Sequence, residues 1–172
     1  MAKWAGLIFL VLACGISSGA FYADKQMQQS APGVDAFPSL EELPVTGETR
    51  PRPPYLINIF ASWCVPCLAE LPYLREWQNQ TGLPLIGVAW RDKPSAVADW
   101  LEKHEAPFDT VYEDTDGNAL SALSLEGLPM SYLIDAEGEI VFTHRGVLTE
   151  ENLPELLKES KTLVESNEAS EQ

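Results

Sequence analysis

Short runs rich in apolar, β-branched and aromatic residues predict the strands of this chain. They are Leu56–Phe60, Leu85–Trp90, Thr110–Tyr112, Met130–Ile134 and Ile140–Arg145. The first run is bounded upstream by Pro53-Pro54, which favours a buried central strand. The last two runs are separated only by a short turn sequence with Gly138, and this spacing predicts an antiparallel pair.

Apolar residues spaced three or four apart predict the helices. Leu68, Leu71, Leu74 and Trp77 form one face of a helix directly after the first strand, and Pro72 should kink it. The other expected helices are one capped by Ser95 with Val97, Trp100 and Leu101 on its apolar face, a short one at Ala119–Leu123, and a last one burying Leu153, Leu156 and Leu157. The last helix begins at Thr149 or Asn152, and Pro154 favours the later start.

The two ends of the chain differ in composition from the centre. Lys3 precedes an uncharged run, Trp4–Ala23, so residues 1–23 are expected to be a membrane anchor or a signal segment. A signal segment would be cleaved near Ala20. A third alternative is a lipoprotein signal with lipidation at Cys14. Residues 24–53 are expected to be a linker with a possible edge strand near Ala36–Leu43. Residues 54–158 form the α/β domain, and residues 159–172 form an acidic tail that we expect to be disordered from Glu165 onward.

Charge excludes one class of partner. The chain has 172 residues and a formal net charge of −15. Nucleic acid is therefore an unfavourable ligand, because its phosphates would be repelled. The chain has three cysteines, so it has no disulfide framework of the kind found in small secreted domains.

The chemistry is concentrated in Cys64-Val65-Pro66-Cys67, where strand gives way to helix. Unpaired backbone N–H groups at a helix start favour a thiolate, which should lower the pKa of Cys64 and make it the nucleophile. Cys67 lies one turn later, close enough to form a disulfide and more buried. Pro66 is tolerated because the first turn has no intrahelical donor to lose.

Other uses of this cysteine pair fit less well. A zinc site would need further ligands, and His104 and His144 are the available histidines. A c-type haem attachment site needs a histidine directly after the second cysteine, where this chain has Leu68. A structural disulfide closing so short a loop would constrain little of the unfolded chain.

The segment Phe60–Cys67 resembles the active-site signature of membrane-anchored thioredoxin-like proteins. Within them the chain is most similar to the thiol:disulfide interchange proteins of cytochrome c maturation, the DsbE/CcmG type. The similarity extends through Gly87–Asp92, Asp114–Gly117, Gly127–Pro129 and Tyr132–Asp135. It implies a thioredoxin-like fold with a mixed central sheet and helices on both faces.

The resemblance also implies roles for residues around the dithiol. Leu128-Pro129 matches the cis-proline loop that faces the cysteines, where the backbone of Leu128 would pair with a client chain. Glu70, one turn after Cys67, is an auxiliary acid that could tune the thiols or assist proton transfer, or else a solvated surface carboxylate. Trp63 is expected to cover the active site and to offer client contact.

Two positions set this chain apart from relatives of the fold. Asn58 stands where thioredoxin itself has a buried, titratable aspartate, so it is expected to be a hydrogen-bonded core amide. Met130 and Ser131 follow the proline where the DsbE/CcmG type usually has an acidic residue and threonine. We expect Met130 to lie at the rim of the site.

The resemblance implies a periplasmic enzyme, anchored in the bacterial inner membrane by one span. It would reduce the disulfide of apocytochrome c, or of another protein client, and would receive electrons from a membrane thiol transporter. It implies no metal or organic cofactor. Alternatives are a general periplasmic thiol reductase, a copper metallochaperone using Cys64, Cys67 and a histidine, or a chaperone that holds apocytochrome without turnover.

Overall fold

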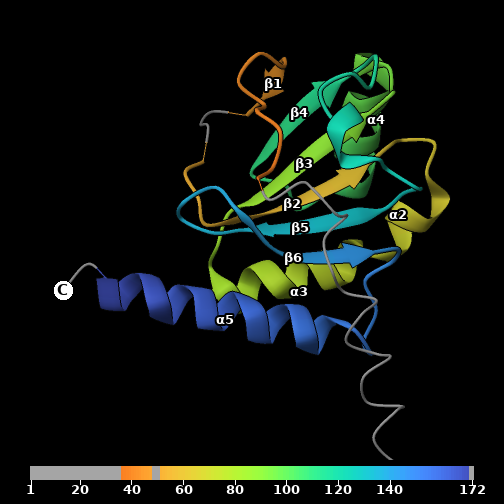
Figure 1. Ribbon diagram of the computed structural model, residues 1–172. Helices are drawn as coiled ribbons and strands as arrows, with labels where there is room; N and C mark the ends of the chain where they lie inside the picture. The colour runs from red at the N-terminus through yellow and green to blue at the C-terminus, as the bar shows by residue number, and fades with distance from the viewer. Residues whose placement is uncertain (1–35, 48–50, 171–172) are drawn as a thin grey trace, which may run out of the picture.

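The computed structural model describes residues 36–47 and 51–170 (Figure 1). The expected anchor, and the first part of the expected linker, lie outside these residues. Within the described ranges, no helix combines the length and apolar character needed to cross a membrane.

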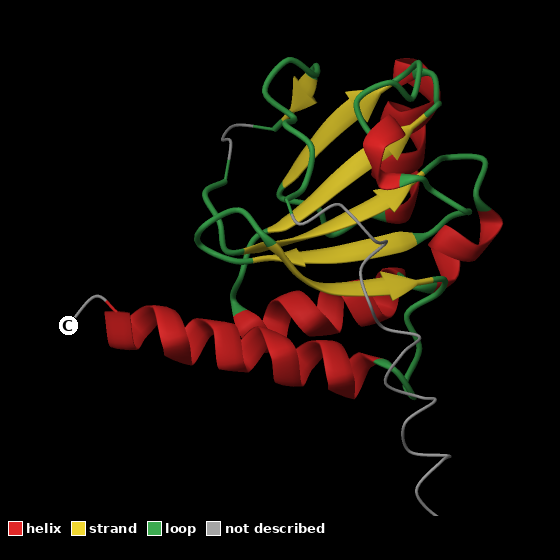
Figure 2. Cartoon of the chain, in the orientation of Figure 1, coloured by secondary structure: helices red, strands yellow, loops and turns green. Residues whose placement is uncertain are grey.

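The described residues form a six-stranded mixed sheet in the order β1-β4-β3-β2-β5-β6 (Figure 2). Strand β2 is central, parallel to β3 and antiparallel to β5, while β4 continues the parallel side and β6 the antiparallel side. The strands are β1 (Val45–Thr46), β2 (Tyr55–Phe60), β3 (Leu85–Trp90), β4 (Thr110–Asp114), β5 (Met130–Ile134) and β6 (Ile140–Arg145). The strand predictions and the antiparallel β5/β6 pair are therefore confirmed.

The helices follow the strands as the apolar spacing predicted. They are α2 (Val65–Ala69), α3 (Leu71–Thr81), α4 (Pro94–His104), the 3-10 helix η1 (Ser121–Leu123) and α5 (Leu153–Ser170). The predicted kink is confirmed, because the helix is interrupted at Glu70 and Pro72 lies in the first turn of α3. The later start of the last helix is also confirmed, directly after Asn152.

Side chains alternate across β2 and so belong to two cores. Leu56 and Phe60 face a cluster that also receives apolar side chains from α3, α4 and α5. Ile57 and Ile59 face the opposite cluster, which η1 and the segment 36–44 cover. Figure 1 shows α3 and α5 lying side by side along one side of the sheet. Trp77 joins these two helices by donating from Nε1 to Ser160 Oγ at 2.9 Å.

Three local predictions were wrong. Helix α4 begins at Pro94 rather than after a Ser95 cap, because proline is preorganised for the first helical position. Only Ser121–Leu123 of the expected helix at Ala119–Leu123 is helical, as a 3-10 turn. The edge strand is Val45–Thr46, since Ala36–Leu43 contributes only a single bridge from Ala36 to Glu139.

The domain limits are also wider than predicted. Phe37, Leu40 and Leu43 pack against the second core, so this part of the expected linker belongs to the domain. At the other end α5 continues to Ser170, and Ser160 is fully buried. The expected disorder from Glu165 is thus corrected to helix, because a helix nucleated by packing extends at little further cost.

Candidate functional site: a dithiol at the end of the central strand

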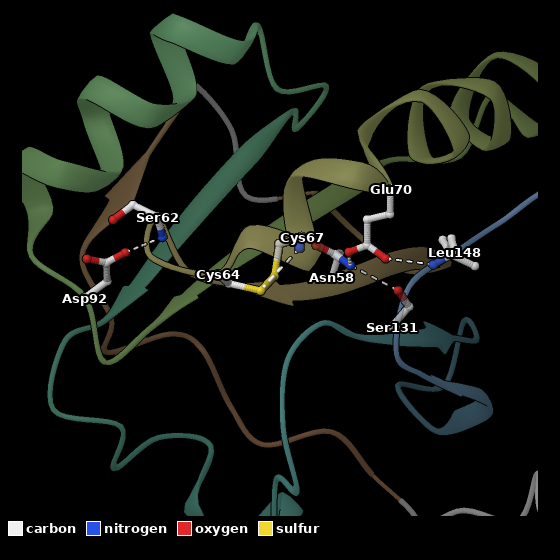
Figure 3. The surroundings of a disulfide bond; sticks show 8 residues. All are labelled: Asn58, Ser62, Cys64, Cys67, Glu70, Asp92, Ser131 and Leu148. Atoms are coloured by element: carbon white, nitrogen blue, oxygen red, sulfur yellow. Dashed lines mark hydrogen bonds between the residues drawn. A yellow bond between two sulfur atoms is a disulfide. The ribbon is translucent and has the colours of Figure 1, made fainter.

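Cys64 and Cys67 lie at the carboxyl end of β2 and are joined by a disulfide, with Cα atoms 5.4 Å apart (Figure 3). Cys64 is the N-cap of α2, and the backbone N–H of Cys67 donates to Cys64 Sγ at 3.3 Å. In the reduced protein a donor at this place stabilises a thiolate on Cys64. Cys67 is 1% exposed against 5% for Cys64, as predicted.

Glu70 is fully buried at the junction of α2 and α3. Its Oε1 accepts from Asn58 Nδ2 at 2.8 Å and its Oε2 accepts from the backbone N–H of Leu148 at 3.0 Å. Burial raises the pKa of Glu70 from 4.5 to about 7, although both hydrogen bonds lower it. The alternative of a solvated surface carboxylate is therefore excluded, and the site holds a carboxyl group that can exchange a proton near neutral pH.

Asn58 links this carboxyl group to β5. Its Nδ2 also donates to Ser131 Oγ at 3.1 Å, and the side chain is almost completely buried. The prediction of a hydrogen-bonded core amide is confirmed. Asn58 Oδ1 accepts no hydrogen bond within the described residues. Figure 3 shows Asn58, Glu70, Ser131 and the backbone of Leu148 as one group on the Cys67 side of the disulfide. Neither Ser131 nor Leu148 was among the predicted site residues. Ser131 was noted only for its place after Pro129, and no local pattern marks Leu148.

Asp92 is a further site residue that sequence reasoning missed. It is buried after β3, where its Oδ2 accepts from the backbone N–H of Ser62 at 2.5 Å and its Oδ1 from that of Lys93 at 2.7 Å (Figure 3). The carboxylate fixes the loop that delivers Cys64. Parallel neighbouring strands bring their carboxyl ends together, so an acidic residue two positions after the second predicted strand was the available signal.

Trp63 and Pro66 lie on the surface beside the dithiol. The Trp63 side chain is 57% exposed and its Nε1 donates to the carbonyl of Arg91 at 3.4 Å. Its expected shielding of Cys64 stays a prediction. Pro66 occupies the first turn of α2, where the sequence placed it.

The peptide bond between Leu128 and Pro129 is cis, as predicted. Leu128 precedes β5 and packs against the cluster that contains both cysteines. Its pairing with a client backbone stays a prediction. Met130, however, is buried in the second core rather than placed at the rim. Strand alternation turns Ser131 toward Asn58 and Met130 to the other face of the sheet.

Within residues 36–47 and 51–170, no three His, Cys, Asp or Glu side chains lie close enough together to hold a metal ion. His144 is locally bonded, with Nε2 3.3 Å from the carbonyl of Val147.

Comparison with known proteins agrees with this geometry. The Redoxin family model matches residues 11–159. A thiol:disulfide interchange protein of Pasteurella multocida (strain Pm70), DsbE-2, is 30% identical over 152 residues, which cover 84% of this chain and 80% of that protein. The thiol:disulfide interchange protein DsbE homolog of Paracoccus denitrificans (strain Pd 1222) is 30% identical over 176 residues, covering 92% and 97% respectively.

Solved structures support the fold. The chain superimposes on a structure described as a thiol:disulfide interchange protein DsbE from Chlorobium tepidum with a TM-score of 0.54 and 26% identity, covering 63% of this chain and 77% of that one. The thioredoxin-like fold is thereby confirmed. With the Cys64–Cys67 pair at disulfide distance, this chain belongs to the Redoxin family and, within it, to the DsbE/CycY-type thiol:disulfide oxidoreductases.

Proposed function

We propose that this enzyme reduces the disulfide of apocytochrome c before haem attachment, in the periplasm, while anchored in the inner membrane. The observation that carries the proposal is the buried Glu70–Asn58 pair beside the dithiol. It gives this site a titratable carboxyl group on the active-site helix, in place of the strand aspartate of thioredoxin itself. The membership in the DsbE/CycY type supports the same assignment.

Reduction proceeds by two exchanges. The Cys64 thiolate attacks one sulfur of the client disulfide, so that a bond between Cys64 and the client forms while the client's own S–S bond breaks. The second client sulfur leaves as a thiolate and takes a proton. Cys67, once deprotonated, attacks Cys64 Sγ and releases the first client sulfur. Two electrons have then passed to the client, and the Cys64–Cys67 disulfide remains.

Glu70 is the group that accepts the proton of Cys67 in the second exchange. It lies one helical turn after Cys67. Because its pKa is about 7, both the protonated and the ionised form are populated at neutral pH. Asn58 and the N–H of Leu148 hold the carboxylate in place. A membrane thiol transporter would then return two electrons to the disulfide.

The run Trp4–Ala23 after Lys3 supports membrane attachment, with the domain outside the cytoplasm. Extraction of bacterial membranes with carbonate tests this, because an anchored chain stays with the lipid. Release of a shortened protein that begins near Phe21 would instead indicate a cleaved signal segment. Incorporation of labelled palmitate would indicate lipidation at Cys14.

The decisive experiment is to trap the client. A Cys67→Ala variant cannot resolve the mixed disulfide, so proteins linked to Cys64 accumulate and can be identified by mass spectrometry. We expect polypeptides with a Cys-x-x-Cys-His motif, and a Cys64→Ala/Cys67→Ala double variant as control should trap none. A varied set of periplasmic proteins without that motif would favour the general reductase instead.

A further inference from the structure

The surface beside Cys64 exposes apolar side chains. Val65 is 80% exposed and Leu68 is 39% exposed. The two lie three residues apart on α2 and therefore share one face of that helix. Exposed apolar residues grouped next to a reactive atom indicate a contact surface rather than random surface composition.

A groove of about 370 Å³ lies between this face of α2 and helix α4. Cys64 lines it, with Leu68 on the α2 side and Ala96 and Trp100 on the α4 side. We call it the α2/α4 groove. Ala96, Trp100 and Lys103 follow the spacing of one helical face, so α4 presents a continuous wall to the groove. Its volume lies at the lower end of the usual range for ligand pockets, about 300–1,000 Å³, which suits one or two side chains.

The charges around the groove balance. Asp99 and Lys103 both line it and carry opposite signs. The groove therefore differs from the acidic chain as a whole, whose net charge is −15. A strongly basic or acidic segment gains little here, and apolar burial is the remaining source of affinity.

Because Cys64 lines the groove, the client chain bonded to Cys64 lies next to it during exchange. During exchange its Sγ forms a bond to a client sulfur while the bond between that sulfur and its former partner breaks. The client residue next to the bonded cysteine has its Cα only about 3.8 Å along the chain. We propose that the α2/α4 groove binds the side chain of the client residue adjacent to the reacting cysteine and selects apolar side chains there. This proposal rests on disulfide exchange alone, not on the cytochrome assignment.

Single-cysteine peptides activated as 2-pyridyl disulfides provide the test. Attack by Cys64 joins the peptide sulfur to the protein and releases 2-thiopyridone, which is followed by its absorbance. Two peptide pairs carry leucine or glycine immediately before or immediately after the cysteine. The protein is the reduced full chain with Cys14→Ser, so that only the dithiol reacts. In one of the two pairs we expect the leucine peptide to react about tenfold faster than the glycine peptide. A tenfold difference in rate is what partial burial of one leucine side chain would produce.

Variants separate the groove from the dithiol chemistry. Ala96→Trp fills the groove, so the leucine-to-glycine rate ratio should fall to about one. Ala98→Trp is the matched control, because Ala98 is exposed on α4 and does not line the groove, and it should keep the wild-type ratio. If thermal unfolding shows that Ala96→Trp does not fold, Leu68→Ser serves instead, since Leu68 is already partly exposed.

Equal rates for leucine and glycine in both pairs would overturn the proposal, and so would an unchanged ratio in a folded Ala96→Trp or Leu68→Ser protein. N-acetylcysteine activated in the same way measures the intrinsic reactivity of Cys64. If cytochromes were absent among trapped clients while the leucine preference held, the cytochrome assignment would fail and the groove would stand.

Discussion

Replacing Glu70 by glutamine should stabilise the oxidised protein above neutral pH. The pKa of Glu70 rises from 4.5 in the unfolded chain to about 7 in the folded protein. The folded state thus binds the proton more tightly, and its stability falls as the pH rises from 4.5 to about 7. The full penalty of ionising this buried group, roughly 3 kcal/mol, applies above that range.

Glutamine removes the ionisation and can keep the hydrogen bonds. The oxygen of the glutamine can accept from the N–H of Leu148. If the Asn58 side-chain amide flips, the glutamine NH2 group can donate to Asn58 Oδ1, which has no partner in the described structure. Urea denaturation should therefore show Glu70→Gln more stable than wild type at pH about 8 by up to roughly 3 kcal/mol. The difference in the free energy of unfolding between Glu70→Gln and wild type should become smaller toward pH about 4.5.

Glu102→Gln is the matched control, because Glu102 is exposed on α4. It should follow the wild-type pH dependence. If Glu70→Gln also kept the wild-type dependence between pH 4.5 and about 7, Glu70 would not be the group that titrates there, and its proposed proton exchange would be refuted. In turnover, the variant should resolve mixed disulfides about a hundredfold more slowly, the lower end of general-base catalysis.

Three further outcomes are expected. Met130→Glu should cost about 3 kcal/mol or more in urea denaturation, because it buries a carboxylate in the second core, and unchanged stability would contradict the placement of Met130. Ser160→Ala should cost about 1–3 kcal/mol by leaving the Trp77 indole N–H unpaired, whereas no loss would mean that this bond is not formed in solution. Alkylation of the reduced protein at pH about 6 should label Cys64 before Cys67 in peptide mass spectra, and the opposite order would exchange their roles.

The sequence by itself determined the strands and the position of the dithiol through local patterns, while the cis bond at Pro129 was expected only from the family resemblance. Short runs of apolar, β-branched and aromatic residues predicted β2, β3, β5 and β6, and Pro72 predicted the break in the active-site helix. The position of Cys64 at a helix start follows from its immediate neighbours. These features depend on residues a few positions apart, so a single chain carries enough information to predict them.

Tertiary structure alone decided the environment of the dithiol. The spacing of Glu70 was compatible with an auxiliary acid or with a surface carboxylate. The structure shows it buried, hydrogen-bonded to Asn58 and to the backbone of Leu148. Asp92 accepts a hydrogen bond from the backbone of Ser62, in the loop before Cys64, because β3 lies beside β2. Similarly, helix α5 extends past its predicted end, and Ser160 of α5 ties it to Trp77 of α3. Burial and pKa depend on segments distant in the chain, and a local pattern does not contain those contacts.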